Sequence, residues 1–87
     1  MPESASIQVK VLFFSVLRER VGTAQRALMV APGSTGGALL DAIEAAHPSV
    51  APYRSVVRLA VNECYADEDV VLHDGDEVAL ITPVSGG

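Results

Sequence analysis

Cysteine and histidine are scarce in this sequence. The chain of 87 residues has one cysteine, Cys64, and two histidines, His47 and His73. A single cysteine excludes an internal disulfide, and no Cys/His cluster has the spacing of a metal site. We therefore predict no bound metal and a reducing, cytoplasmic environment, in which disulfides are rare.

Basic residues and long apolar runs are also few. Six Lys and Arg stand against eleven Asp and Glu, so the net charge is -5, which would repel a phosphate backbone. No apolar run approaches the roughly 20 residues that a membrane-spanning helix needs. Residues 1–6 have neither the basic nor the apolar part of a signal peptide. We predict no nucleic-acid partner, no membrane insertion and no export.

The length and composition of the chain fit one globular domain. The chain is 49% hydrophobic and 20% charged, which is ordinary for a globular protein with a single core. We predict a disordered N-terminus over residues 1–5, a folded domain over 6–81 and a flexible tail over 82–87.

Hydrophobic periodicity divides the first third of the chain into three elements. Apolar residues alternate over 7–14, which predicts a central strand. Ser15 is a candidate N-cap for a short helix that Gly22 would end. The stretch Gln25–Val30 predicts a second strand, antiparallel to the first, and turn residues follow at 31–34.

The middle of the chain predicts one long helix, capped by Ser34 or Thr35. Gly36 and Gly37 would weaken its first turn by up to about 1 kcal/mol each, and Pro48 would end it. Residues 48–53 would then form an irregular connection. Helical spacing puts four apolar residues on one stripe, namely Leu39, Leu40, Ile43 and Ala46. The carboxylates of Asp41 and Glu44 would face water.

Three further strands are predicted in the remaining sequence. A strand over about 56–61 is followed by a turn at Asn62-Glu63 and a brief return strand at Cys64-Tyr65. A strong turn at 73–76 leads into the last strand, Glu77–Ile81.

This order of elements predicts an α+β fold in which a mixed sheet packs on one main helix. Ubiquitin and its relatives have the same order. In their β-grasp fold the first and last strands lie side by side and parallel at the centre of the sheet. That placement suits the two most apolar strands of this chain.

The last six residues, Thr82-Pro83-Val84-Ser85-Gly86-Gly87, carry the functional signal. Two terminal glycines arise by chance in only about 0.5% of chains, given an average glycine frequency of about 7%. Many termini are simply disordered, but here Pro83 stiffens the exit from the sheet and glycine occupies only the tip. Such a tail reaches about 20 Å and could thread a narrow channel. We predict that the Gly87 carboxylate, next to Gly86, is the functional group.

Four segments together resemble the MoaD-like family of ubiquitin-fold sulfur carriers, the small subunits of molybdopterin synthase. The resemblance covers nearly the whole chain, although the family commonly has a second proline where this chain has Thr82. The segments are Val9-Lys10-Val11-Leu12-Phe13-Phe14 with Leu17-Arg18-Glu19, Leu59-Ala60-Val61-Asn62, Leu72-His73-Asp74-Gly75-Asp76-Glu77-Val78-Ala79, and Pro83-Val84-Ser85-Gly86-Gly87.

The resemblance implies a cycle in which this chain is not catalytic alone. An E1-like adenylating enzyme would use ATP and Mg²⁺ to activate Gly87. A sulfurtransferase would then act as the sulfur donor and convert the activated carboxylate into a thiocarboxylate. The large subunit of molybdopterin synthase would accept the tail and pass its sulfur to cyclic pyranopterin monophosphate in molybdenum cofactor biosynthesis. The family's usual assembly is a heterotetramer of two small and two large subunits. No cofactor would be bound by this chain itself.

The apolar strand that leads into the tail predicts the partner-binding surface. Leu80 or Ile81, whichever faces outward, would contact the large subunit together with the tail residues Thr82, Pro83, Val84 and Ser85.

Other conspicuous residues have simpler interpretations. Asp74-Gly75-Asp76-Glu77 lacks the spacing of a calcium loop and predicts a tight turn. The segment 33–37 predicts a loop with a helix cap rather than an anion cradle, and Cys64 lacks a motif that would favour a persulfide carrier. His47 and His73 are interpreted as solvated or capping residues. The alternatives left open are a sulfur carrier for thiamine or another pathway, a ubiquitin-like protein modifier and a nonenzymatic interaction domain.

Overall fold

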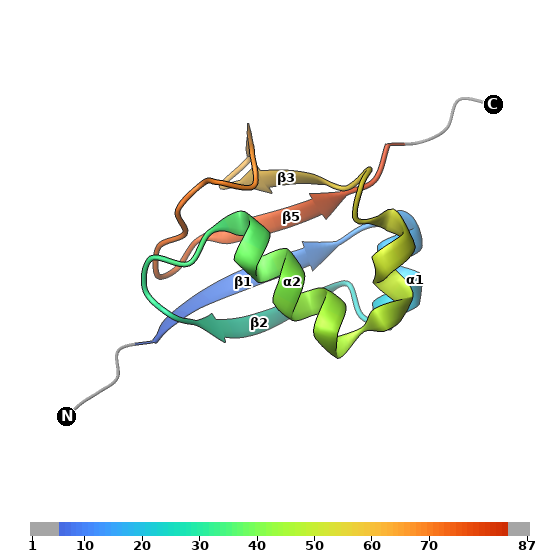
Figure 1. The fold of residues 1–87 in the computed structure, drawn as a ribbon, viewed down its shortest axis with the longest axis horizontal. Coiled ribbons are helices and arrows are strands. Elements are labelled where there is room, and N and C mark those ends of the chain that lie inside the picture. The colour runs from blue at the N-terminus through green and yellow to red at the C-terminus, as the bar shows by residue number, and fades with distance from the viewer. Residues whose placement is uncertain (1–5, 84–87) are drawn as a thin grey trace.

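The computed structural model describes residues 6–83 and shows one five-stranded sheet with helices on one of its faces (Figure 1). Along the chain the elements are β1 (Ile7–Phe13), α1 (Ser15–Val21), β2 (Gln25–Val30), α2 (Gly36–Ala46), the 3-10 helix η1 (Pro48–Tyr53), β3 (Arg58–Val61), β4 (Cys64–Ala66) and β5 (Glu77–Ile81). The predicted disorder of 1–5 lies outside the described residues, as does most of the predicted flexible tail.

The strand order is β2-β1-β5-β3-β4. The first and last strands are parallel neighbours at the centre, with Val11 opposite Val78 and Phe13 opposite Leu80. The other pairs, β1 with β2, β3 with β5 and β3 with β4, are antiparallel. The predicted α+β, ubiquitin-like β-grasp fold with one main helix is therefore confirmed.

The core lies between α2 and the sheet. Alternate residues of the central strands point into it, because side chains of a strand alternate between its two faces. Val9 and Val11 from β1 and Val78 and Leu80 from β5 have no exposed surface. From α2 the core receives Leu39, Leu40 and Ile43. Each such side chain contributes about 1.5–3 kcal/mol through burial, so the alternation of β1 and β5 fixes which face the helix covers.

The start of α1 differs from the prediction. Ser15 is not the N-cap but the first helical residue, with a φ of 51°. Phe14 stands at the cap position with extended backbone and no side-chain hydrogen bond. The predicted end is confirmed: Gly22 has a φ of 93°, and its N–H donates to the Arg18 carbonyl at 2.8 Å. A left-handed residue at that position favours glycine.

The predicted long helix is confirmed, and Thr35 rather than Ser34 caps it. The Thr35 hydroxyl accepts a hydrogen bond from the Ala38 N–H at 3.2 Å. Of the predicted apolar stripe, Leu39, Leu40 and Ile43 are buried, whereas Ala46, the last residue of the helix, is exposed. The helix ends at Ala46 and His47 is its C-cap residue, as the following proline predicts.

Gly36 and Gly37 stand where another segment crosses the start of α2. Their N–H groups donate to the carbonyls of Val70 and Glu68, at 2.9 and 2.8 Å. A Cβ on Gly36 would lie 2.5 Å from the Leu59 Cδ1 atom. The glycines therefore permit a close approach that gives two helix N–H groups partners outside the helix, which offsets their low helix propensity.

Two parts of the connection before β3 were predicted incorrectly. Residues 48–53 form the 3-10 helix η1 instead of an irregular connection. The strand predicted from about Val56 begins only at Arg58, because the N–H groups of Val56 and Val57 both donate to the Tyr53 carbonyl at 3.0 Å. Beyond β3 the predictions hold. Asn62 and Glu63 form the turn with positive φ, and the return strand β4 extends to Ala66.

Candidate functional site

The last strand leads the chain out of the middle of the sheet. β5 is hydrogen-bonded to β1 on one side and to β3 on the other, and it points toward the end of the chain (Figure 1). After Ile81, Thr82 is 8% exposed and Pro83 is exposed. The segment before the tail is therefore fixed by two strand ladders, which end at Leu80 on the β1 side and at Ile81 on the β3 side.

The choice between Leu80 and Ile81 is resolved by the pleat of β5. Leu80 is fully buried in the core under α2, so it offers no surface to a partner. Ile81 is half-buried on the opposite face, where its Cα partner is Arg58 of β3. Val84, Ser85, Gly86 and Gly87 lie outside the described residues, so their roles stay predictions.

The face of the sheet opposite α2 carries a short apolar row across its centre. Leu12 of β1 stands opposite Ala79 of β5, which stands opposite Ala60 of β3. Ile81 lies on the same face as this row, two residues further along β5. Phe14, 45% exposed, follows β1 at the same end of the sheet. The tail thus leaves beside apolar surface that other proteins can contact.

An open groove of about 550 Å³ lies along the edge of the sheet next to the tail exit. One wall is formed by residues 55–58, before and at the start of β3, and the other by residues 65–68, at the end of β4 and just beyond it. Leu59 lies between the walls, and Pro83 also lines the groove. The sequence prediction missed this groove, since its first wall was assigned to a straight strand.

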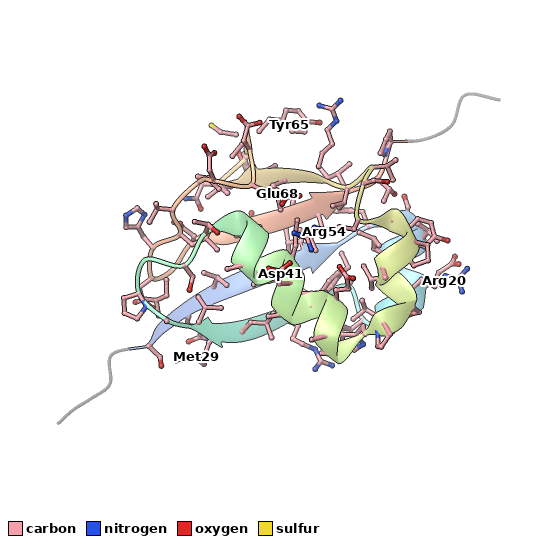
Figure 2. The ribbon with its side chains drawn as sticks, in the orientation of Figure 1. Arg20, Met29, Asp41, Arg54, Tyr65 and Glu68 are labelled. Carbon is pink, nitrogen blue, oxygen red and sulfur yellow. The ribbon has the colours of Figure 1, made fainter. Side chains whose placement is uncertain are left out.

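Arg54 ties the two walls of this groove together. It directly precedes Ser55, and its Nη2 atom lies 3.0 Å from Glu68 Oε1. Its Nη1 atom lies 2.8 Å from Asp41 Oδ1 (Figure 2) and 3.2 Å from Glu44 Oε1. Hydrogen bonds to Glu68 and then Asp41 raise the pKa of Arg54 above its usual value. The two helix carboxylates predicted to face water are thus also bound to this arginine.

The turn at 73–76 is held by its own carboxylates, which confirms the structural interpretation of this acidic motif. Asp74 Oδ1 accepts from the Gln8 N–H at 2.7 Å. Asp76 accepts from the His73 N–H at 2.8 Å and from Asn62 Nδ2 at 2.9 Å. These two hydrogen bonds, led by that from His73, lower the pKa of Asp76.

Within residues 6–83 no group of three His, Cys, Asp or Glu side chains is arranged to hold a metal ion. Over the same residues no helix has the length and apolar character needed to cross a membrane. Cys64 is exposed on the edge strand β4.

The fold and the exit of β5 define a ubiquitin-like β-grasp domain whose central, last strand leads directly to the final residues of the sequence. A family model described as the ThiS family matches residues 11–87. The chain belongs to the ThiS family.

Individual relatives are similar along nearly their whole length. A molybdopterin synthase sulfur carrier subunit of Arabidopsis thaliana is 38% identical over 85 residues, which are 98% of this chain and 88% of that protein. A putative molybdopterin converting factor subunit 1 of Pyrococcus furiosus superposes with a TM-score of 0.83 at 29% identity, covering 91% of this chain and all of that one. Small archaeal modifier protein 1 of Haloferax volcanii has a TM-score of 0.79 at 26% identity, covering 90% of this chain and 99% of that one.

Proposed function

We propose that this protein is the sulfur carrier subunit of a molybdopterin synthase and that the Gly87 carboxylate carries the sulfur. The observation that supports this best is the 38% identity over 98% of the chain to a protein of that name. The family match also runs through Gly87. In addition, β5 occupies the centre of the sheet, which provides a rigid base for an arm that begins at Thr82.

The proposed chemistry takes place at the tip of that arm. A carboxylate oxygen of Gly87 attacks the α-phosphorus of ATP on an E1-like enzyme with Mg²⁺, so that pyrophosphate leaves and an acyl adenylate forms. A persulfide on a sulfurtransferase then attacks the carbonyl carbon and displaces AMP, which leaves an acyl disulfide. A second thiol of that enzyme attacks the sulfur bound to the enzyme, so that an enzyme disulfide forms and the thiocarboxylate leaves. In the large subunit this sulfur passes to cyclic pyranopterin monophosphate. This chain supplies the arm and its anchoring, and it binds no cofactor itself.

The surface proposed to bind the large subunit lies around the tail exit. Ile81 and Pro83 present apolar surface there, and the apolar row of Leu12, Ala79 and Ala60 is next to them. Apolar surface at the centre of an interface typically carries much of the affinity. We propose a heterotetramer of two small and two large subunits in the cytoplasm.

The first test measures the intact mass of the protein after co-expression with the activating enzyme and the sulfur donor. We expect one oxygen to be replaced by sulfur at the C-terminus, located by fragmentation. The variant Cys64→Ser should be modified to the same extent. Modification at Cys64 with an unchanged C-terminus would refute the carrier mechanism.

The second test changes the length of the arm. Deleting Gly87, or adding one alanine after it, displaces the reacting group by about 3.5 Å, and a misplacement of even 1 Å can cost about 100-fold in rate. Gly86→Val should act similarly if the tail threads a narrow channel. We expect sulfur transfer to fall by at least about 100-fold while the melting temperature and most of the partner affinity remain. Normal turnover by the extended variant would contradict the proposal.

The similarity to small archaeal modifier protein 1 supports a second candidate function, conjugation of Gly87 to amines of other proteins. Lys10 is the one lysine in the sequence, and its Nζ atom lies 3.8 Å from Glu77 Oε2. Self-linked chains would therefore have a single side-chain acceptor. A ladder of conjugates that requires Gly87, with Lys10→Arg removing only the self-linked bands, would favour this function over sulfur transfer.

A further inference from the structure

We infer that the groove between residues 55–58 and 65–68 is a docking site for a segment of the large subunit that presents an apolar side chain beside a basic one. This inference rests on the proposed function, because it assigns a second contact to the partner that takes the tail. It extends the contact at Ile81 toward the edge of the sheet, since Arg58 on one wall of the groove is the Cα partner of Ile81.

The groove exists because β3 and β4 pair only at their turn-proximal ends. The register pairs Leu59 with Ala66 and ends there. Before Leu59 the chain bends back to the Tyr53 carbonyl, and after Ala66 it turns toward the start of α2, where Gly37 N–H binds the Glu68 carbonyl. The two diverging segments leave about 550 Å³ between them.

The position of the groove connects it to the tail. Pro83 lines the groove, and the next residue in the sequence already belongs to the segment that must enter the partner. A protein that receives the Gly87 tip therefore lies within about 20 Å of the start of the tail, the reach of six residues. This geometry favours the protein that takes the tail as the occupant of the groove.

The rim of the groove carries two large side chains that are exposed to water. Val56 on one wall is 47% exposed and Tyr65 on the other is 72% exposed. Tyrosine is enriched at such interfaces because it combines a large apolar ring with a polar tip. An apolar side chain of the partner placed between them would remove both from water.

The charges of the groove indicate a basic neighbour for that apolar side chain. Glu68 is already bound to Arg54, whereas Asp67, on the same wall and exposed, takes part in none of the ion pairs formed among residues 6–83. Arg58, on the opposite wall and also exposed, takes part in none of these ion pairs either, but the net charge of the chain is -5, which favours a basic partner. A cation on the Asp67 side would be attracted, and one on the Arg58 side would be repelled.

The experiment compares charge changes at the two walls, using the purified large subunit of molybdopterin synthase from the same source as this chain. Affinity is measured at low and high salt for the wild type, Asp67→Lys, Arg58→Glu and the control Glu63→Lys. Glu63 is exposed in the turn at the far end of β3, and its substitution makes the same charge change as Asp67→Lys. Val56→Ser is measured in the same way, Asp67→Asn serves as a milder second variant, and melting temperatures are measured for all of these proteins.

We expect Asp67→Lys to raise Kd by about tenfold or more at low salt, and the difference to shrink at high salt. Glu63→Lys should stay within about twofold of the wild type, and Arg58→Glu should bind as well or better. Val56→Ser should weaken binding at both salt concentrations, since its contact is apolar.

Three outcomes would overturn the inference. Asp67→Lys and Glu63→Lys could bind equally well, Asp67→Lys could bind more tightly, or Asp67→Lys could impair only adenylation by the activating enzyme and leave the large subunit's Kd unchanged. Failure of the proposed function is distinguishable from these, because the wild type would then neither bind the large subunit nor deliver sulfur to it.

Discussion

The two faces of the sheet use the same strands in opposite ways. Under α2 the side chains of Val78 and Leu80 are buried completely, and substitutions there act on the stability of the domain. On the open face their neighbours Ala79 and Ile81 remain partly exposed. Because successive residues of a strand alternate between faces, one five-residue strand serves both the core and the proposed partner surface. Stability and binding are therefore expected to be separable one residue at a time.

The largest expected effect comes from Leu80→Ala. It removes a fully buried side chain from the core, which typically costs about 2–5 kcal/mol of unfolding free energy. Ile81→Ala on the open face should cost about 1 kcal/mol or less, yet weaken large-subunit affinity by about tenfold. Urea unfolding and calorimetric binding measure the two quantities. If Ile81→Ala destabilised the domain as much as Leu80→Ala, the separation of the faces would be wrong.

The close crossing at the start of α2 gives the next largest effect, on the helix-covered side. Gly36→Ala places a Cβ 2.5 Å from Leu59 Cδ1, and such overpacking costs about 1–3 kcal/mol despite the better helix propensity of alanine. Gly37→Ala is the matched control. Its Cβ would be closest to Glu68 Oε1, at 3.1 Å, which a flexible side chain can relieve. The urea midpoint should fall for Gly36→Ala and change less for Gly37→Ala.

Asp76 directly precedes β5, at the end of the strand that lies away from the tail. Its substitution tests how much the hydrogen bonds at that end stabilise the domain. Asp76→Ala removes two hydrogen bonds and should cost about 1–3 kcal/mol near pH 7. Since folding lowers the pKa of Asp76, its stabilisation is present above the unfolded value of about 3.9 and is lost as the pH falls through the folded value.

The difference in unfolding free energy between wild type and Asp76→Ala should therefore narrow below about pH 4. Glu63→Ala in the neighbouring turn controls for the loss of a carboxylate. A difference that is constant from pH 7 to pH 3 would contradict the role of the ionised carboxylate.

Arg54→Met is expected to have the smallest effect on stability. Its carboxylate partners are 38–72% exposed, and exposed ion pairs typically contribute 1 kcal/mol or less. We expect a loss of about 1 kcal/mol that high salt reduces, because salt screens the pairs in the wild type. A loss that salt does not change would mean that the arginine stem, rather than its charge, stabilises the walls of the groove.

The sequence predicted the strands of the sheet and their central pairing because β1 and β5 carry strong apolar alternation. It could not decide between Leu80 and Ile81, since both are apolar and the face that α2 covers is set by the whole sheet. Gly36 and Gly37 suggested a weak helix start. Glycine is needed there because the start of α2 lies close to Leu59 and Val70. Local patterns could not predict this contact, since it joins residues that are far apart in the sequence.

The groove could not be predicted from local sequence patterns for the same reason. Val56 and Val57 have high strand propensity and were predicted to extend β3, but the carbonyl of Tyr53 binds both of their N–H groups. Ser15 failed as an N-cap because β1 ends at Phe13 and the next residue, Phe14, takes the cap position. Local patterns thus predicted the elements, while the surface beside the tail depends on where elements stop.

The two-sided pairing of β5 has a mechanical consequence. A force that pulls on the tail acts along the strand, so the hydrogen bonds to β1 and β3 share the load in shear instead of opening one after another. Tension applied at the end of β5 is therefore borne by two ladders at once. Six residues in fully extended form span about 20 Å, so under the proposed function the length of the segment from Thr82 to Gly87 limits how deep in a partner the acceptor atom can lie.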